Sequence, residues 1–254
     1  MYLNHLFGLS GKAAVITGGS MGIGQVLAKG LAQAGAEVFI FSRSSAEHVV
    51  KEIVDIQGKA HWIKTDITDE NQVQESIRQV IDEAGKIDML VNNAGICVHE
   101  KSLEASASSF NKVMDLNVNA QFFITKHVAQ VMVDKGVEGN IVNIASMSGS
   151  IVNLPQMQAS YNASKAALIH LTKSLAIEWA DKGIKVNSLS PGYVATNMSV
   201  NTPDELKSAW AKLIPMKRMA EPEELIPPLL FLVSDSCKYV TGSDIIIDGG
   251  YTAF

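Results

Sequence analysis

Tyr161 and Lys165 are the residues whose types and spacing most directly suggest a reaction. They lie four positions apart in the segment YNASK, residues 161–165, and residues at that spacing share one face of a helix. A nearby ammonium group favours the phenolate and lowers the pKa of a tyrosine from its usual value of about 10. We therefore expect Tyr161 to donate and accept a proton, whereas in chains generally the same pattern more often marks a solvated helix face.

Three serines precede this pair in the segment IVNIASMSGS, residues 141–150: Ser146, Ser148 and Ser150. A serine hydroxyl polarises a carbonyl group when it donates a hydrogen bond to the oxygen on which negative charge develops. Reduction of a ketone by hydride transfer leaves an alkoxide that needs a proton, which Tyr161 would supply. These residue types therefore predict the interconversion of a ketone and an alcohol.

Short apolar segments alternate with longer amphipathic segments along the whole chain. This alternation is typical of a parallel sheet covered by helices on both faces, so we predict an α/β fold with a doubly wound sheet of about seven strands. The predicted strands are residues 13–17, 37–41, 61–65, 89–93, 140–145, 184–190 and 244–248. The predicted helices are residues 22–34, 46–57, 69–84, 106–135, 160–182 and 222–234.

The longest connections, residues 93–105, 146–159 and 191–221, each follow a predicted strand. Ligands of an open parallel sheet bind beyond the carboxyl ends of the strands, so this edge is predicted to be functional. Residues 193–220 are rich in turn formers, carry one short helical stretch near 203–213, and are predicted to form a substrate lid. No repeat or interior linker divides residues 1–254, which we interpret as one domain.

A glycine-rich loop, TGGSMGIG at residues 17–24, joins the first predicted strand to the first predicted helix. Such a loop lets the backbone approach a pyrophosphate at the helix N-terminus. The spacing Gly18-x-x-x-Gly22-x-Gly24 differs from the common G-x-G-x-x-G, and a plain tight turn is the alternative. We predict dinucleotide binding through Gly18, Ser20, Met21, Gly22 and Ile23.

The end of the second predicted strand, FIFSRSS, indicates which dinucleotide binds. NAD-binding sites of this kind place an acidic residue there to accept hydrogen bonds from a ribose hydroxyl, whereas this chain has Ser42 and Arg43. A guanidinium can pair with a 2′-phosphate. The sequence therefore predicts NADP(H), with a solvated surface arginine as the alternative.

Two further segments follow predicted strands at the same edge. Asp66 and Ile67 come after the third strand and could flank an adenine, although an aspartate there is more often a helix cap. The segment NNAG comes after the fourth strand and brings Asn93, Ala94 and Gly95 against the cofactor riboses. Their order along the chain supports one shared cleft.

With Asn117 and the segment SPGYVATNM, residues 190–198, these motifs resemble the short-chain dehydrogenase/reductase family over essentially the whole chain. The resemblance implies a Rossmann-type fold with Tyr161 as acid and base. It also implies that Lys165 holds the nicotinamide ribose and that Ser146, in the pattern S-x-x-G, polarises the substrate. Ser148 remains the alternative to Ser146.

The resemblance implies further roles in the same site. Asn117 matches an asparagine that supports a water relay to the lysine, with Asn119 as the less favoured candidate. The nicotinamide and phosphates are expected to meet Pro191, Gly192, Val194 and Thr196.

The substrate pocket is predicted to be lined by residues 97–101, 147–158 and 197–215. Neutral amides are frequent there, and buried hydroxyl groups of a substrate need such partners; the amides could equally face solvent. They are Asn153, Gln156, Gln158, Asn197 and Asn201. These segments also resemble the mannitol 2-dehydrogenase and sorbose reductase branch of the family, which implies a ketose–polyol substrate pair.

Three other functions remain as alternatives. A gluconate 5-dehydrogenase-like activity would use the same machinery. A 3-oxoacyl-carrier-protein reductase-like activity is less favoured, because Lys212, Lys217 and Arg218 form only a modest basic cluster for an acidic carrier. A non-catalytic NADP(H)-sensing protein would not need the reactive residues.

Composition argues against several other classes. The net charge of −5 and pI of about 5.7 disfavour nucleic acid as a partner, and no run of about 18 apolar residues predicts a membrane span. The six histidines form no ligand pattern, so no metal is expected, and the two distant cysteines suit a reducing compartment. Without a signal-peptide pattern, we expect a cytoplasmic protein.

The family resemblance implies a homotetramer. Apolar residues on two long predicted helices could supply the contacts, and the terminal segment DGGYTAF could reach a neighbouring subunit. The apolar residues are Phe122, Phe123, Leu168, Leu171 and Trp179.

Overall fold

The computed structural model describes residues 2–196 and 203–253. The predicted pocket residues Asn197 and Asn201 lie outside the described residues. Seven parallel strands form one sheet in the order β3-β2-β1-β4-β5-β6-β7, which confirms the predicted α/β fold. The strands are β1 (Ala13–Thr17), β2 (Glu37–Ser42), β3 (Lys59–Lys64), β4 (Met89–Asn92), β5 (Asn140–Ile144), β6 (Lys185–Pro191) and β7 (Asp244–Ile247).

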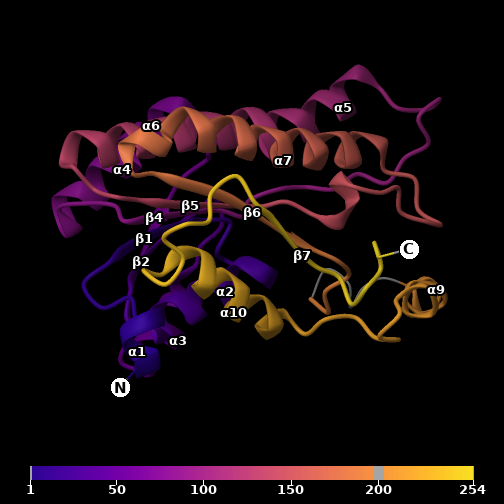
Figure 1. Cartoon of the computed structure of the whole chain (residues 1–254). Helices are drawn as coiled ribbons and strands as arrows, with labels where there is room; N and C mark the ends of the chain where they lie inside the picture. The colour runs from indigo at the N-terminus through magenta and orange to yellow at the C-terminus, as the bar shows by residue number, and fades with distance from the viewer. Residues whose placement is uncertain (1, 197–202, 254) are drawn as a thin grey trace.

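Helices cover both faces of the sheet (Figure 1). One face is covered by α4 (Glu70–Ala84), α6 (Ala120–Lys135) and α7 (Ala159–Trp179). The other is covered by α2 (Gly22–Gln33), α3 (Glu47–Asp55) and α10 (Ile226–Val233). Every residue of the central strands β1, β4 and β5 is buried, because their side chains enter an apolar layer on each face.

The helices differ from the prediction in three places. A short helix, α1 (Tyr2–Phe7), was not predicted. The predicted helix 106–135 consists of α5 (Ala107–Met114), a π-helical turn (Asp115–Asn119) and α6. The predicted helix 222–234 begins with a 3₁₀ turn (Pro222–Leu225).

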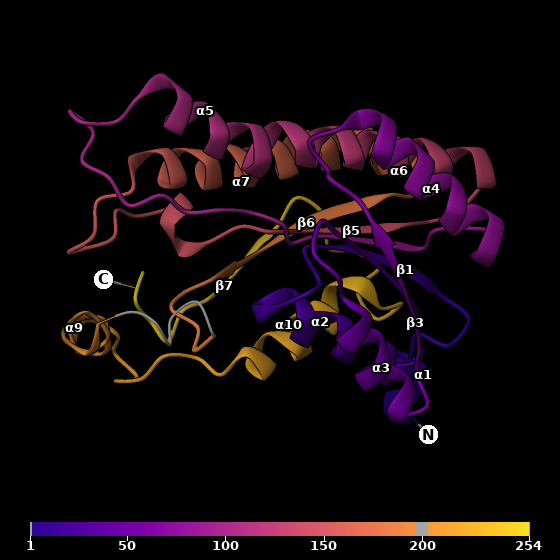
Figure 2. The same ribbon diagram turned by 180° about the vertical axis from the view of Figure 1, so that it is seen from behind.

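The connections between β strands place functional loops at one edge. The turn after α4 is tight, because Gly85 adopts φ of +75° and its N–H bonds to the carbonyl of Ile81. The loops at the opposite ends of the strands are longer and lie beside α5 and α9 (Asp204–Leu213), as the view from behind shows (Figure 2). The helix α9 matches the predicted helical stretch of the lid.

Within residues 2–196 and 203–253, no helix combines the length and the apolar character needed to cross a bilayer.

Candidate active site

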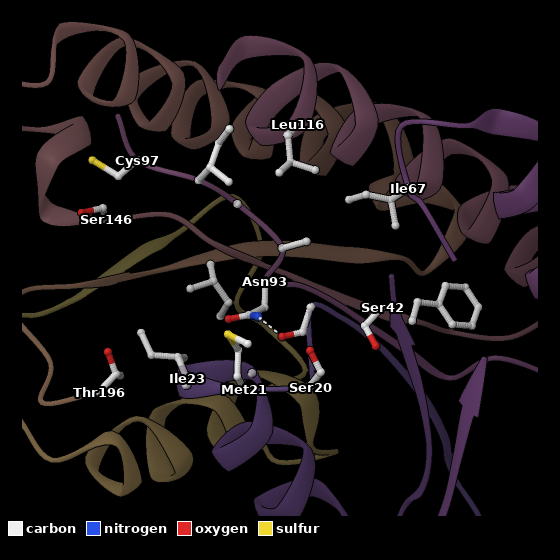
Figure 3. A pocket seen from close by; sticks show the side chains of 18 of the residues that line it. Ser20, Met21, Ile23, Ser42, Ile67, Asn93, Cys97, Leu116, Ser146 and Thr196 are labelled. Atoms are coloured by element: carbon white, nitrogen blue, oxygen red, sulfur yellow. Dashed lines mark hydrogen bonds between the residues drawn. The ribbon is translucent and has the colours of Figure 1, made fainter. Parts of the chain in front are cut away.

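A cavity of about 490 Å³ lies at the carboxyl edge of the sheet. Loops following six of the seven strands, β1 to β6, contribute to its wall. In Figure 3, Ser42 and Ile67 lie toward one end, while Cys97 and Ser146 lie at the other. The cavity therefore links the predicted adenine-binding end to the predicted reactive end.

The glycine loop closes around an asparagine amide. Asn93 donates from Nδ2 to the carbonyl oxygens of Thr17 (3.0 Å) and Gly18 (3.1 Å). A Cβ at Gly24 would lie 2.3 Å from the Gly18 oxygen and 2.4 Å from this Asn93 nitrogen. Only a glycine fits there, so this residue lets α2 begin close beneath the loop.

The first turn of α2 suits an anion. Its N-cap residue, Met21, makes no side-chain capping hydrogen bond, and no acidic residue lies in the first turn. The cavity is lined by Gly22, Ile23 and Gly24 at this point. Unpartnered N–H groups at a helix N-terminus bind phosphate groups well, so the loop fits a dinucleotide pyrophosphate.

At the end of the cavity where Ser42 and Ile67 lie, Arg43 lies beside Asp66. Their closest charged atoms, Nη1 and Oδ2, are 3.8 Å apart, and the Arg43 side chain is 70% exposed. The Ser42 hydroxyl donates to the Ser44 carbonyl (2.7 Å), and Asp66 Oδ1 accepts from both the backbone and the hydroxyl of Thr68. A guanidinium with this freedom can turn to a ligand phosphate.

Tyr161 and Lys165 share one face of α7, as their spacing predicts. Lys165 Nζ lies 5.6 Å from the centroid of the Tyr161 ring and donates to the carbonyl of Ile144 (2.7 Å). The Ser146 hydroxyl is close enough to the Tyr161 phenol to act on its pKa. The structure thus brings together the phenol, the ammonium and one of the two candidate serines.

The predicted lowering of the Tyr161 pKa is wrong for this structure. Burial raises the pKa of Tyr161 to about 12, and the nearby Ser146 hydroxyl only partly opposes this rise. Burial also lowers the pKa of Lys165 to about 8. The cause is the same for both groups, because a low-polarity surrounding disfavours phenolate and ammonium alike.

The two candidate serines are placed differently. Ser146 lines the cavity, whereas Ser148 is not among the lining residues and lies behind Ser146 in the 3₁₀ turn Met147–Gly149. The Ser146 hydroxyl donates to Ser148 Oγ (3.1 Å) and accepts from the Ser148 backbone N–H (3.1 Å). This geometry favours Ser146 as the serine that meets a substrate.

Asn117 lies in the π-helical turn and is completely buried. Its side chain donates to the Ile96 carbonyl (2.9 Å) and to Ser164 Oγ (3.0 Å), and accepts from the Ile96 N–H (2.9 Å). A Cβ at Gly95 would lie 3.1 Å from Asn117 Oδ1 and 3.7 Å from Lys165 Nζ, so the asparagine and the lysine flank that glycine. Asn119 is exposed and bonds to Asp115.

The predicted cofactor residues line this one cavity, with a single exception. The side chain of Val194 lies in the hydrophobic core instead, so its predicted contact with the nicotinamide stays a prediction.

Cys97 lines the cavity and was not predicted as a site residue, although the loop 97–101 was predicted to line the substrate pocket. Its place two residues after Gly95 is the signal that could have identified it. Other lining residues that were not predicted include Phe41, Ser44, Thr65, Ile96, Leu116, Ile144 and Ala145.

The three predicted pocket amides that the structure describes, Asn153, Gln156 and Gln158, are all hydrogen-bonded to other side chains. Asn153 and Gln156 both donate to the Tyr193 hydroxyl, at 3.2 and 2.8 Å. Gln156 also accepts from Trp210 Nε1 on α9 (3.0 Å), and the rings of Tyr193 and Trp210 stack 4.4 Å apart. These contacts join the loop before α7 to the predicted lid.

Among the described residues, one group could in principle hold a metal ion: Glu37, His61 and Glu83. It lies away from the cavity, since Glu37 begins β2. His61 Nε2 already lies 2.9 Å from Glu37 Oε1, so a hydrogen bond satisfies the ring without an ion.

Comparisons with known proteins agree with this arrangement. A family model described as Enoyl-(Acyl carrier protein) reductase matches residues 18–252. A sorbose reductase of Candida albicans is 40% identical over 251 residues, covering 97% of this chain and 89% of that protein. A probable NADP-dependent mannitol dehydrogenase of Yarrowia lipolytica is 42% identical over 252 residues, covering 96% and 89%.

A solved structure shares the whole fold. The crystal structure of a short-chain type dehydrogenase/reductase from Mycobacterium marinum has a TM-score of 0.94 and 43% sequence identity, with 100% of both chains covered.

Proposed function

Because the chain belongs to the short-chain dehydrogenase/reductase family and acts on CH–OH groups, we propose that it is an NADP(H)-dependent enzyme that interconverts a ketose and a polyol. The observation that carries this proposal is the grouping of Tyr161, Lys165 and Ser146 at one end of a cavity that fits a dinucleotide. Relatives named for sorbose and mannitol support the substrate class.

The residues that line the cavity would hold the dinucleotide along its length. The N–H groups at the start of α2 would bind the pyrophosphate, and Arg43 with Ser42 would bind the 2′-phosphate. The nicotinamide supplies or accepts the hydride when it is bound. Small residues at 94 and 95 leave room for the ribose, and Lys165 would hold the ribose hydroxyls.

Tyr161 would donate the proton that completes ketone reduction. Because its pKa is about 12, the phenol is protonated at neutral pH and ready to act as an acid. Ser146 would donate a hydrogen bond to the carbonyl oxygen and stabilise the charge that develops there. Lys165 and Asn117 would then restore the proton through a water relay.

The direct test of the proposal is an assay of NADPH consumption with fructose, sorbose, 5-ketogluconate and an acetoacetyl thioester. We expect turnover with the ketoses. Turnover only with 5-ketogluconate or only with the thioester would transfer the assignment to one of the two enzymatic alternatives. Tight NADPH binding without turnover of any carbonyl would favour an NADP(H) sensor.

The carrier-protein alternative has less support from the charges near the lid. Arg218 pairs with Glu224 through its two terminal guanidinium nitrogens, Nη1 and Nη2. Lys217 donates to the carbonyl of Lys212 (2.9 Å). These contacts reduce the basic surface that an acidic carrier would need.

The preference for NADPH is expected to depend on Arg43. The double variant Ser42→Asp with Arg43→Gln should reduce kcat/KM for NADPH about 10- to 100-fold, since a hydrogen bond to a charged group contributes roughly 1.5–3 kcal/mol. It should also raise kcat/KM for NADH, because the new carboxylate repels the 2′-phosphate and accepts from a ribose hydroxyl.

Steady-state kinetics with both cofactors measure this change. Arg78→Gln is the matched control, because Arg78 is an exposed arginine of α4 paired with Glu75. An NADPH preference that survives in the double variant would contradict the assignment of the cofactor.

The pH profile of ketone reduction is expected to fall above pH about 8. Tyr161 stays protonated there because its pKa is about 12, whereas Lys165 loses its charge as the pH passes its pKa of about 8. Measurement of kcat/KM for reduction from pH ~6 to pH ~10 tests this. A level profile across that range would show that the charge of Lys165 is not needed.

We also propose that the single domain assembles as a homotetramer, as the family resemblance implies. Of the five apolar residues predicted to form contacts, only Phe123 is exposed at 39%, while Leu168 is fully buried and the other three pack against the core. Ile177 on α7 is 81% exposed and extends the apolar surface. Light scattering should give four chain masses, and a monomer would refute this state.

The predicted contact of the C-terminal segment with a neighbouring subunit has less support. The ring of Tyr251 packs edge-on against Tyr193 of the same chain, with centroids 5.7 Å apart. Phe254 lies outside the described residues.

A further inference from the structure

Ser148 and Gln158 lie behind Ser146 and have no part in the mechanism so far. Ser148 is 4% exposed and Gln158 is 5% exposed. Gln158 Nε2 lies 3.3 Å from Ser148 Oγ, and Ser148 Oγ lies 3.1 Å from Ser146 Oγ. A continuous chain of polar groups therefore leads from Gln158 to the wall of the cavity, where Figure 3 shows Ser146 beside Cys97.

The hydroxyl hydrogen of Ser146 is already used in this structure. It is donated to Ser148 Oγ, and a hydroxyl group has only one hydrogen to donate. Ser146 can polarise a substrate carbonyl only after that hydrogen turns away from Ser148. The turn leaves a buried lone pair on Ser148 without its donor, which costs free energy unless another donor takes its place.

Gln158 can supply the hydrogen bond that Ser148 Oγ loses. Its amide nitrogen carries two hydrogens but lies near three acceptors: Ser148 Oγ, Asn153 Oδ1 (3.1 Å) and Asn162 Oδ1 (2.9 Å). One of these hydrogens can therefore strengthen its hydrogen bond to Ser148 Oγ once Ser146 no longer donates to that oxygen. On the far side of the amide, the Cys97 thiol donates to Gln158 Oε1 (3.7 Å).

The direction of donation follows from the chemistry of the amide. The Gln158 nitrogen donates and does not accept, so the hydrogen of Ser148 must point elsewhere. Ser146 Oγ lies 3.1 Å away, and in this proposal it accepts that hydrogen once its own has turned to the substrate carbonyl. With both hydroxyls rotated, every bond in the chain runs from Gln158 toward the cavity, and aligned hydrogen bonds strengthen one another.

We propose that Gln158 and Ser148 are positioning residues that turn the Ser146 hydroxyl toward the substrate carbonyl. This inference rests on the proposed function, because it assigns a role within ketone reduction. Neither residue touches the substrate in this scheme. Each acts through Ser146, whose donated hydrogen bond is strengthened where charge develops in the transition state.

Two substitutions test the proposal. Ser148→Ala removes the middle group and Gln158→Leu removes the first donor. Each should lower kcat for ketose reduction about tenfold, less than the 10²–10³-fold loss that follows removal of a direct oxyanion donor. The Kd for NADPH should change little, since neither side chain lines the cavity. The Tm of Gln158→Leu should fall, because the buried acceptors that Gln158 serves lose their donor, so the loss of kcat is judged by the comparison of two ketones below.

Two further variants serve as controls. Ser148→Thr keeps the hydroxyl and should restore most of kcat. Ser150→Ala removes an exposed serine from the same segment and should leave kcat at the wild-type value.

A comparison of two ketones separates positioning from a general loss of structure. A trifluoromethyl ketone is already polarised, so its reduction depends less on Ser146 than reduction of the methyl counterpart. Both test variants should therefore lose less activity on the fluorinated ketone. Equal losses on the two ketones, or activity equal to that of Ser150→Ala, would overturn the role of Ser148 and Gln158.

The proposed function can fail separately. If the wild-type protein reduces no ketone, the proposed function is wrong and this role falls with it. If the wild type reduces ketoses and the variants match the controls, only the inference about Ser148 and Gln158 is wrong.

Discussion

Replacing Tyr161 with phenylalanine is expected to lower kcat for ketose reduction by about 10³-fold, because a positioned general acid contributes roughly 10²–10⁴-fold. The change removes one oxygen and leaves the ring that packs beside Lys165. NADPH should therefore still bind. Stopped-flow or steady-state assays of NADPH oxidation give kcat, and quenching of protein fluorescence gives the Kd for NADPH.

The control for this variant makes the same chemical change elsewhere. Tyr239 is fully exposed, so Tyr239→Phe should keep the wild-type kcat. If Tyr161→Phe binds NADPH normally and keeps more than about one tenth of the wild-type kcat, the assignment of Tyr161 as the general acid is wrong. A loss that small falls below the range for general acids.

Replacing Gly24 with alanine is expected to weaken NADPH binding by about 100-fold or more. The new Cβ would lie 2.3 Å from the Gly18 carbonyl oxygen and 2.4 Å from Asn93 Nδ2, and the contact with the backbone oxygen cannot be relieved without moving the loop. The amide that holds Thr17 and Gly18 would be displaced, and the N–H groups of α2 would lose their alignment with the pyrophosphate.

Isothermal titration calorimetry of NADPH, together with Tm, measures this effect. Gly136→Ala is the matched control: its φ of +62° strains a side chain, but a Cβ there would meet no atom within 4 Å. It should cost about 1 kcal/mol of stability and leave the Kd for NADPH unchanged. Equal affinities in wild type and Gly24→Ala would show that the loop does not cradle the cofactor.

The central strands could be predicted closely because burial on both faces leaves continuous apolar runs. The run AAVIT gives the bounds of β1, Ala13–Thr17, without error. The edge strand β3 extends two residues further toward the N-terminus than predicted, from Lys59. Exposed lysines at both of its ends interrupt the apolar pattern, and the prediction rests on that pattern.

The helix that contains Asn117 shows what a local pattern cannot reveal. The residues 106–135 have continuous helical character, yet a π-helical turn interrupts them at Asp115–Asn119. The side chain at 117 bonds to both backbone groups of Ile96, which is 21 residues away. Such a long-range contact depends on the assembled sheet and cannot be derived from helical periodicity.

The reactive pair was predicted in position but not in its electrostatics. The spacing of Tyr161 and Lys165 correctly gave a shared helix face. The pKa values depend on burial by many surrounding residues, which raises one and lowers the other. The amides at 153, 156 and 158 were likewise found in the expected loop. The bonds of Asn153 and Gln156 to Tyr193 join that loop to a distant segment and could not be derived from it.

The most direct test of the account is to trace the hydride itself. The protein is incubated with sorbose or fructose and NADPH deuterated at carbon 4 of the nicotinamide, with each face labelled in turn, and the product is examined by mass spectrometry and NMR. We predict a polyol that carries deuterium at carbon 2 from one labelled face only. A polyol that is unlabelled with both labelled cofactors, or no polyol while the labelled cofactor binds, would contradict the proposed reduction of a ketose.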